Sequence, residues 1–116
     1  MIIGIGFDFI EVDRIKQVAE KYPKFLNRIF TPREQTYCLA QPNPYLHFAA
    51  RFAAKEAFFK ALGRRIPWSK IGVYNLPSGQ PELELFIPSP LDFDRMKVSL
   101  SHLKSLAGAV VILEKD

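Results

Sequence analysis

Two acidic residues and a lysine occupy segments that are otherwise apolar or strongly helix-forming. Asp8 is the only charged residue among residues 1–10, whose β-branched and aromatic side chains are typical of a strand. Glu56 and Lys60 lie one helical turn apart in residues 51–63, where Glu56 interrupts a face that would otherwise pack into a core. Two isolated carboxylates without clustered Cys or His suit a hard cation such as Mg²⁺, and such a cation indicates phosphate chemistry.

Both acids also have ordinary structural interpretations, which the sequence alone leaves open. Asp8 can end the strand and cap a helix that starts near Ile10, as Asp often does. Glu56 can form an i,i+4 ion pair with Lys60, an interaction worth only about 0.2 to 0.5 kcal/mol.

A second group of polar side chains lies in residues 98–104, where a strand is expected to end. Hydroxyl groups, an imidazole and an amine at such a tip could hold a phosphate. The alternative is that His102 is a loop histidine with one hydrogen bond and that Ser101 is a turn residue. The Gly-x-Ser-x-Gly elbow of hydrolases is absent, and His47 gives less indication of a function than His102.

Basic and apolar side chains occur together in the two segments that follow the first strand. The net charge of +4 suggests an acidic or phosphorylated partner, although an ordinary solvated surface also carries such a charge. A helix is expected from about Ile10 to Lys21, followed by a break at Pro23 and a further short helix. A strip on these helices suits docking on an acidic amphipathic helix, and the alternative is an ordinary exposed face. The strip comprises Arg14, Lys21, Phe25 and Arg28.

The composition indicates one globular domain over residues 1–116, with 48% hydrophobic residues. The single Cys38 fits a reducing compartment, and the cytoplasm is the default location. No membrane span, signal peptide or zinc site is evident. The dispersed basic residues and the lack of an RNA-binding motif argue against nucleic acid as the partner.

The remaining pattern predicts an α+β domain. Thr31, Pro32 and Glu34 form a helix start, so a helix should continue to about Ala40. A long helix is expected from about Tyr45 to Leu62, ending at Gly63. Strands are expected over residues 71–75, 82–87, 97–100 and 107–113, with a turn at Ser78-Gly79 and a surface connection at Pro88-Ser89-Pro90.

Three blocks of the sequence together form a family pattern. They are GIGFDFIE at residues 4–11, RFAAKEAFFKALG at residues 51–63, and VSLSH at residues 98–102 with the closing strand at residues 107–114. Their order and spacing resemble those of the holo-[acyl carrier protein] synthases, the small bacterial 4′-phosphopantetheinyl transferases. The resemblance implies that family's fold, a single α+β domain with a mainly antiparallel sheet packed on a long helix.

The resemblance also implies a reaction, in which phosphopantetheine passes from coenzyme A to a serine of apo-acyl carrier protein and adenosine 3′,5′-bisphosphate is released. Asp8 and Glu56 match the family's metal-binding acids, which would hold Mg²⁺, and Lys60 matches a lysine at the phosphates. The base is either Glu56 or a metal-bound water that it orients. The implied catalytic residues are Asp8, Glu56 and Lys60, and the implied coenzyme A contacts are Arg51, Lys60, Gly63 and His102.

The family likeness gives the basic strip a partner, because the recognition helix of the carrier protein is acidic. It further implies a cytoplasmic homotrimer of fatty acid biosynthesis, with each active site between neighbouring subunits. The rival is a non-catalytic carrier-protein-binding subunit of the same fold, against which the retention of Asp8, Glu56 and Lys60 argues.

Several positions depart from the family pattern. Apolar side chains replace small polar ones that would be expected near the site, and two arginines replace the usual Thr-Gly after Gly63. The arginines could supply charge to the coenzyme A phosphates or simply reflect a reshaped loop. The departures are Phe7, Phe59, Leu103 and Arg64-Arg65.

Overall fold

The structure is a computed structural model that describes residues 1–87 and 91–116. The surface connection expected at Pro88-Ser89-Pro90 lies outside the described residues. The helices are α1 (Val12–Lys21), α2 (Phe25–Ile29), α3 (Pro32–Leu39), α4 (Pro44–Leu62) and the short 3-10 helix η1 (Trp68–Lys70). The strands are β1 (Ile2–Glu11), β2 (Ile71–Asn75), β3 (Pro81–Leu85), β4 (Arg95–His102) and β5 (Leu106–Glu114).

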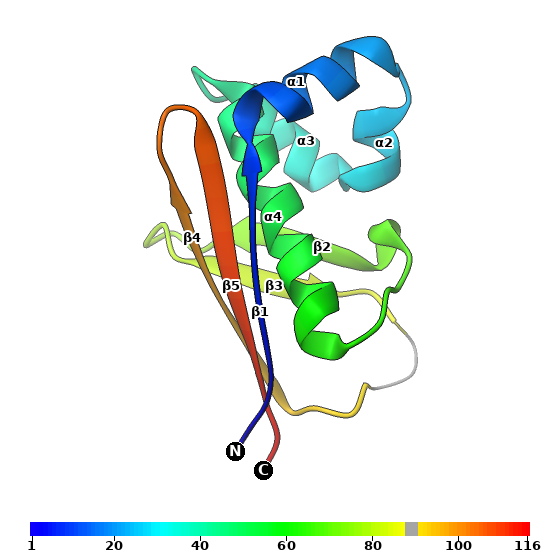
Figure 1. Cartoon of the computed structure of the whole chain (residues 1–116), viewed down its shortest axis with the longest axis vertical. Coiled ribbons are helices and arrows are strands. Elements are labelled where there is room, and N and C mark those ends of the chain that lie inside the picture. The colour runs from blue at the N-terminus through cyan, green and yellow to red at the C-terminus, as the bar shows by residue number, and fades with distance from the viewer. Residues whose placement is uncertain (88–90) are drawn as a thin grey trace.

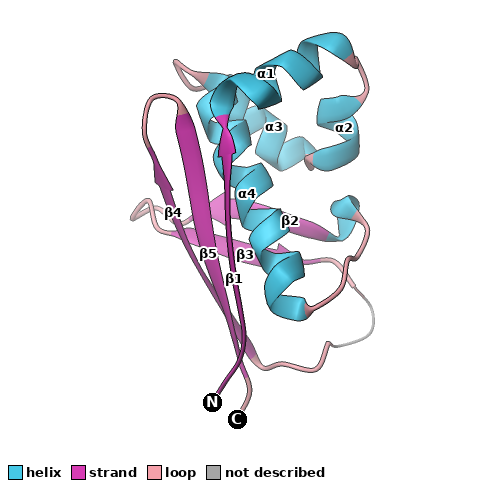
Figure 2. Ribbon diagram, viewed as in Figure 1, coloured by secondary structure: helices cyan, strands magenta, loops and turns pink. Residues whose placement is uncertain are grey.

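The long helix α4 is the centre of the fold (Figure 1). On one side lies an antiparallel sheet with strand order β1-β5-β4, and on the other lies the antiparallel pair β2-β3. Figure 2 shows α1, α2 and α3 grouped around the N-terminal part of α4, while the two chain termini lie together at the far end of the sheet. The predicted α+β fold, with antiparallel strands packed on a long helix, is confirmed.

The ends of several elements follow from local sequence signals. Thr31 and Glu34 form a capping box at the start of α3, as predicted, and Gly63 ends α4 with a φ of 83°. Gly79 forms the predicted turn between β2 and β3 with a φ of 92°. The strand boundaries shift by one to two residues at most ends, and none of the helices in the described ranges is long and apolar enough to cross a bilayer.

The first strand is longer than predicted. Residues through Glu11 pair with β5, so α1 begins at Val12 rather than near Ile10, and Glu11 occupies the N-cap position. Asp8 lies inside β1, opposite Ala109. The interpretation of Asp8 as a strand-ending helix cap is therefore wrong, because the ladder continues for three residues beyond it.

Two glycines let β1 contact the backbone of α4. A Cβ atom at Gly6 would lie 1.8 Å from the carbonyl oxygen of Ala57, and one at Gly4 would lie 2.2 Å from that of Ala61. No side chain fits in these gaps. Because side chains alternate along a strand, Asp8 lies on the same face as the glycines, toward α4. The glycines thus bring this acid against the helix that carries Glu56 and Lys60.

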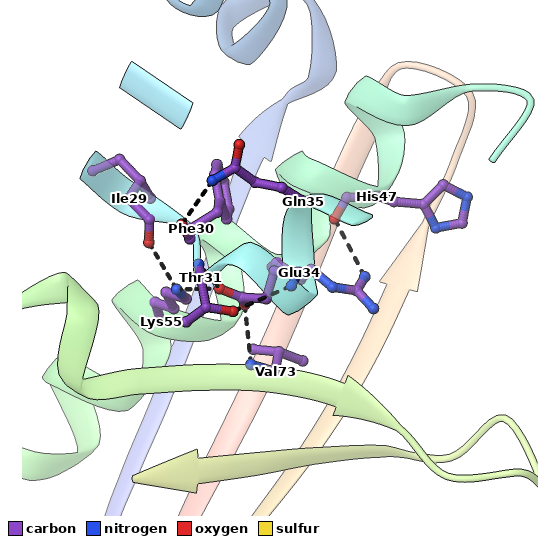
Figure 3. A network of polar contacts seen from close by, with 9 residues as sticks. Ile29, Phe30, Thr31, Glu34, Gln35, His47, Lys55 and Val73 are labelled. Atoms are coloured by element: carbon purple, nitrogen blue, oxygen red, sulfur yellow. Dashed lines mark hydrogen bonds and ion pairs between the residues drawn. The ribbon is translucent and has the colours of Figure 1, made fainter. Parts of the chain in front are cut away.

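A buried ion pair joins α3 to α4, and the sequence analysis did not anticipate it (Figure 3). Lys55 is 0% exposed and donates to Glu34 Oε1 at 2.6 Å and to the carbonyl oxygen of Ile29 at 2.7 Å. Glu34 also accepts from the backbone N–H of Thr31 at 2.8 Å and from that of Val73 at 3.0 Å. Burial lowers the pKa of Lys55, and the neighbouring Glu34 carboxylate opposes this effect. This network ties together α2, α3, α4 and β2.

Breaking this pair on one side should strongly destabilise the fold. In Lys55→Met the carboxylate of Glu34 loses its buried cation, and we expect unfolding to become easier by about 3 to 5 kcal/mol. Urea denaturation followed by the fluorescence of Trp68, the only tryptophan, measures the change. Lys60→Met is the matched control, because the Lys60 side chain is 55% exposed and its loss should cost far less. Equal destabilisation by the two variants would contradict the assignment.

Candidate active site

The first cluster of candidate residues lies where β1 meets α4. The amine of Lys60 donates to Asp8 Oδ1 at 3.0 Å and to the carbonyl oxygen of Phe7 at 3.1 Å. Lys60 follows Glu56 by one turn of α4, so Asp8, Glu56 and Lys60 lie on the same side of this helix. The side chains of Asp8 and Glu56 are 19% and 16% exposed, which makes both carboxylates partly shielded from water but reachable.

Glu56 is held by a residue that follows the helix. Arg65 donates from both terminal nitrogens to the two carboxylate oxygens of Glu56, at 3.1 and 3.0 Å. Its guanidinium also lies over the rings of Phe59 and Trp68, at 5.3 and 5.9 Å from their centroids. The interpretation of Glu56 and Lys60 as an i,i+4 pair is therefore wrong, because Lys60 pairs with Asp8 and Glu56 with Arg65.

This arrangement explains part of the departures from the family pattern. Phe59 is buried against Phe58 and Trp68 and forms the apolar floor on which Arg65 rests. Phe7 and Leu103 are exposed and line a groove on the outer face of the sheet, where neither side chain faces α4. Of the two arginines that replace the usual Thr-Gly, Arg65 pairs with Glu56.

The two acids fit a hard cation that needs only one or two ligands from the protein. Lys60 already pairs with Asp8 and Arg65 with Glu56, so this site favours positively charged ligands. Within residues 1–87 and 91–116, no group of three or more His, Cys, Asp or Glu side chains gathers as a metal cage. Mg²⁺ commonly binds through one or two carboxylates and completes its shell with water and substrate phosphates. The donor set present here matches that mode rather than a zinc or calcium site.

The second cluster lies across α4 from the first. Arg51 and Glu56 are five residues apart on the helix, which turns their side chains about 140° away from each other. Arg51 is 2% exposed and shares a cavity of about 200 Å³ with His102, the last residue of β4. His47 lines the same cavity, a position that the sequence analysis set aside. Its spacing of four residues from Arg51 on α4 was the signal that could have found it.

The basic strip is divided between exposed and packed residues. Arg14 and Lys21 on α1 and Arg28 on α2 are exposed, as a docking surface requires. Phe25 is partly buried, with its ring 6.3 Å from that of Phe30 and 6.4 Å from that of Phe52. It therefore joins the core beneath the strip and presents only part of its ring to a partner.

Comparison with known protein families shows to which family the chain belongs. The sequence pattern of the 4′-phosphopantetheinyl transferase superfamily matches residues 4–111. The chain belongs to this superfamily. Its relatives include the holo-[acyl-carrier-protein] synthase of Syntrophus aciditrophicus strain SB, 43% identical over 124 residues and covering 98% of this chain and 97% of the relative. That of Chloroherpeton thalassium is 44% identical over 118 residues, covering 97% and 98% respectively.

Solved structures of the superfamily agree with the fold. The crystal structure of a holo-(acyl-carrier-protein) synthase from Bacillus anthracis, in complex with CoA (3′,5′-ADP), superposes with a TM-score of 0.86 at 34% identity. It covers 100% of this chain and 99% of that one. Both clusters described above therefore lie on a superfamily scaffold that matches along its whole length.

Proposed function

We propose that this protein is a holo-[acyl carrier protein] synthase, which transfers 4′-phosphopantetheine from coenzyme A to a serine of an apo-acyl carrier protein. The observation that carries the proposal is the gathering of Asp8, Glu56 and Lys60 on one side of α4, within a chain that matches the superfamily over residues 4–111. The relatives bear the name of this activity, and one of them was solved with coenzyme A. A role in fatty acid biosynthesis in the cytoplasm follows from the same activity.

In the proposed reaction, the serine oxygen attacks the phosphorus that bears pantetheine, and the bond from that phosphorus to the bridging diphosphate oxygen breaks. The leaving group is adenosine 3′,5′-bisphosphate. Lys60 places a positive charge where the diphosphate develops negative charge, and it is half exposed and so free to move from Asp8 to a phosphate. The serine proton passes to Glu56 or to a water that Glu56 orients.

Mg²⁺ is the proposed cofactor, held by Asp8 and Glu56. When bound, it would neutralise charge on the diphosphate, as divalent ions do in phosphoryl transfer. In the structure, Lys60 and Arg65 form ion pairs with these carboxylates. Both cationic side chains are more than half exposed, so they can turn toward phosphate oxygens when the cation binds. Gly63 ends α4 beside open space, where no described residue beyond its own helix and chain neighbours has an atom within 4 Å of the position that a Cβ would take. We assign a phosphate to this space.

The nucleotide end of coenzyme A is assigned to Arg51 and His102. Because this pair and the Asp8–Glu56 pair lie on opposite sides of α4, we infer that one ligand is bound between two copies of the chain. The outer face of the β1-β5-β4 sheet supports such an assembly. It exposes Ile5, Phe7 and Phe9, and the last two line an apolar groove of about 340 Å³. A homotrimer with three shared sites is the proposed state.

The acyl carrier protein is proposed to dock on Arg14, Lys21 and Arg28, with part of Phe25 as an apolar contact. These exposed cations complement an acidic helix. The alternative, a non-catalytic subunit that only binds the carrier, explains the strip equally well. It does not explain why two carboxylates and a lysine gather on one side of α4.

Mass spectrometry of an apo-carrier protein incubated with coenzyme A, Mg²⁺ and this protein tests the transfer. The carrier should gain the mass of one phosphopantetheine, and Glu56→Gln should lower the rate by at least about 10²-fold because it removes a charged ligand and base. Circular dichroism checks that the variant keeps its helix content. A carrier that gains no mass with the unmodified protein would favour the non-catalytic subunit.

The shared site predicts complementation between two inactive variants. Glu56→Gln disables one side of α4 and His102→Ala disables the other, so a mixed trimer still assembles some sites from two intact halves. Co-expression with two different affinity tags, followed by tandem purification, should give roughly a third of the transfer activity of the unmodified enzyme, because each mixed trimer combines two intact halves at one of its three sites. Mixed oligomers without activity would show that each chain holds a complete site.

Charge reversal on the strip should slow carrier association. Arg14→Glu is expected to lower the association rate several-fold, with the effect shrinking at high salt, because the Debye length is about 10 Å at 0.1 M ionic strength. Surface plasmon resonance with immobilised apo-carrier protein measures the rate. Lys115→Glu, a half-exposed residue beside the C-terminus at the end of the sheet far from α1 and α2, is the control. An unchanged rate for Arg14→Glu would remove the strip from the docking surface.

A further inference from the structure

The polar side chains of the cavity on the Arg51 side of α4 come from four separate elements. Tyr37 comes from α3, His47 and Arg51 from α4, Asn75 from β2 and His102 from β4. The described residues that line it include one guanidinium and two imidazoles but no carboxylate. The cavity is therefore positively charged, and an anion is the ligand that it suits.

The guanidinium of Arg51 is fixed in place by neutral partners. It donates to Asn75 Oδ1 at 2.5 Å, donates weakly to the carbonyl oxygen of His47 at 3.5 Å and lies 4.3 Å from the ring centroid of Tyr37. Its Nε–H is buried and has no hydrogen-bond partner among the described residues. A buried cation is costly unless an anion compensates it. Lys55, one turn further along α4, has such a partner in Glu34, whereas Arg51 has only neutral ones.

The two imidazoles face each other across this cavity. The ring centroids of His47 and His102 lie 6.2 Å apart, and Tyr37 packs edge-on against His47 at 5.8 Å. The His47 ring points away from the Glu34–Lys55 network (Figure 3). Burial lowers the pKa of His47, and the charges of Arg51 and His102 lower it further. The groups around the ring, namely Tyr37, Arg51, Asn75 and His102, include no acid that would oppose these effects.

We propose that His47 is a third binding residue for the phosphomonoester of the coenzyme A nucleotide, beside Arg51 and His102, and that its imidazole takes up a proton when the dianion binds. This inference rests on the proposed function. A phosphomonoester carries a charge between −1.5 and −2 at neutral pH and offers three acceptor oxygens. Such a ligand offsets the repulsion that Arg51 and His102 exert on a proton at His47, since the protonated ring then also faces the anion.

The geometry gives His47 a role in selectivity rather than in chemistry. The reacting diphosphate is assigned to the opposite side of α4, so His47 contacts only the part of the ligand that does not react. Coenzyme A and 3′-dephospho-coenzyme A share that reacting part and differ in the single phosphomonoester. His47 should therefore strengthen the binding of the first compound and leave the second unaffected.

Isothermal titration calorimetry with these two compounds tests the proposal. In the unmodified protein, coenzyme A should bind more tightly than 3′-dephospho-coenzyme A, and more so at about pH 6 than at about pH 8, because His47 binds the anion in its protonated form. His47→Gln keeps a hydrogen-bonding side chain without the charge. It should lower the preference for coenzyme A about tenfold at the lower pH, the size of one charge-assisted hydrogen bond. Lys104→Gln removes an exposed cation that does not line the cavity and should leave the preference unchanged.

A second measurement uses the unmodified protein and so does not depend on the folding of a variant. In ¹H–¹³C NMR spectra, the titration of the His47 ring should shift to higher pH on addition of adenosine 3′,5′-bisphosphate. Adenosine 5′-diphosphate, which lacks the 3′-phosphate, should produce a smaller shift.

The inference is overturned if His47→Gln weakens coenzyme A and 3′-dephospho-coenzyme A equally, or if the His47 titration does not respond to the bisphosphate. The proposed function fails separately, when the unmodified protein transfers no phosphopantetheine to the carrier. Normal transfer with a selectivity that ignores His47 refutes only the inference. A His47-dependent selectivity without transfer refutes only the enzymatic proposal.

Discussion

The backbone contact between β1 and α4 is the constraint on which the candidate site depends. Gly4 and Gly6 leave no side chain between the strand and the carbonyl groups of the helix. A methyl group at either position would overlap a backbone oxygen, which cannot move aside without disturbing the helix. The strand would have to shift outward and carry Asp8 away from the amine of Lys60. The two glycines thus place a carboxylate although they contribute no chemistry of their own.

The helix α4 separates two places of opposite character. On one side, Asp8 and Glu56 are neutralised by the exposed cations Lys60 and Arg65. On the other side, Arg51 is surrounded by neutral groups and histidines. A ligand with a diphosphate at one end and a phosphomonoester at the other could use both places. Because the two sides face apart within one chain, the proposed function binds one ligand between two chains.

The sequence was informative wherever structure is decided locally. The capping box of Thr31 and Glu34, the end of α4 at Gly63 and the turn at Gly79 depend on residues close in the chain, and all were predicted. The partners of charged residues were not, because pairing depends on which elements the fold brings together. Glu34 was expected only as a helix cap, yet one of its oxygens also binds Lys55, 21 residues away. The alternative that paired Lys60 with Glu56 within the helix is wrong, since Lys60 reaches Asp8, 52 residues away.

The contrast between two buried cations on α4 separates stability from binding. Lys55 and Arg51 are both nearly inaccessible to water and lie one turn apart. The carboxylate of Glu34 compensates Lys55, so this charge belongs to the architecture that joins α2, α3 and β2 to the helix. Arg51 has no carboxylate within hydrogen-bond distance among the described residues, and its burial therefore lowers the stability of the free protein. An anion that enters the cavity restores that lost free energy on binding. The unfavourable charge is thus held in advance at the position where a phosphate would be recognised, and the ligand meets a guanidinium that does not have to be reoriented.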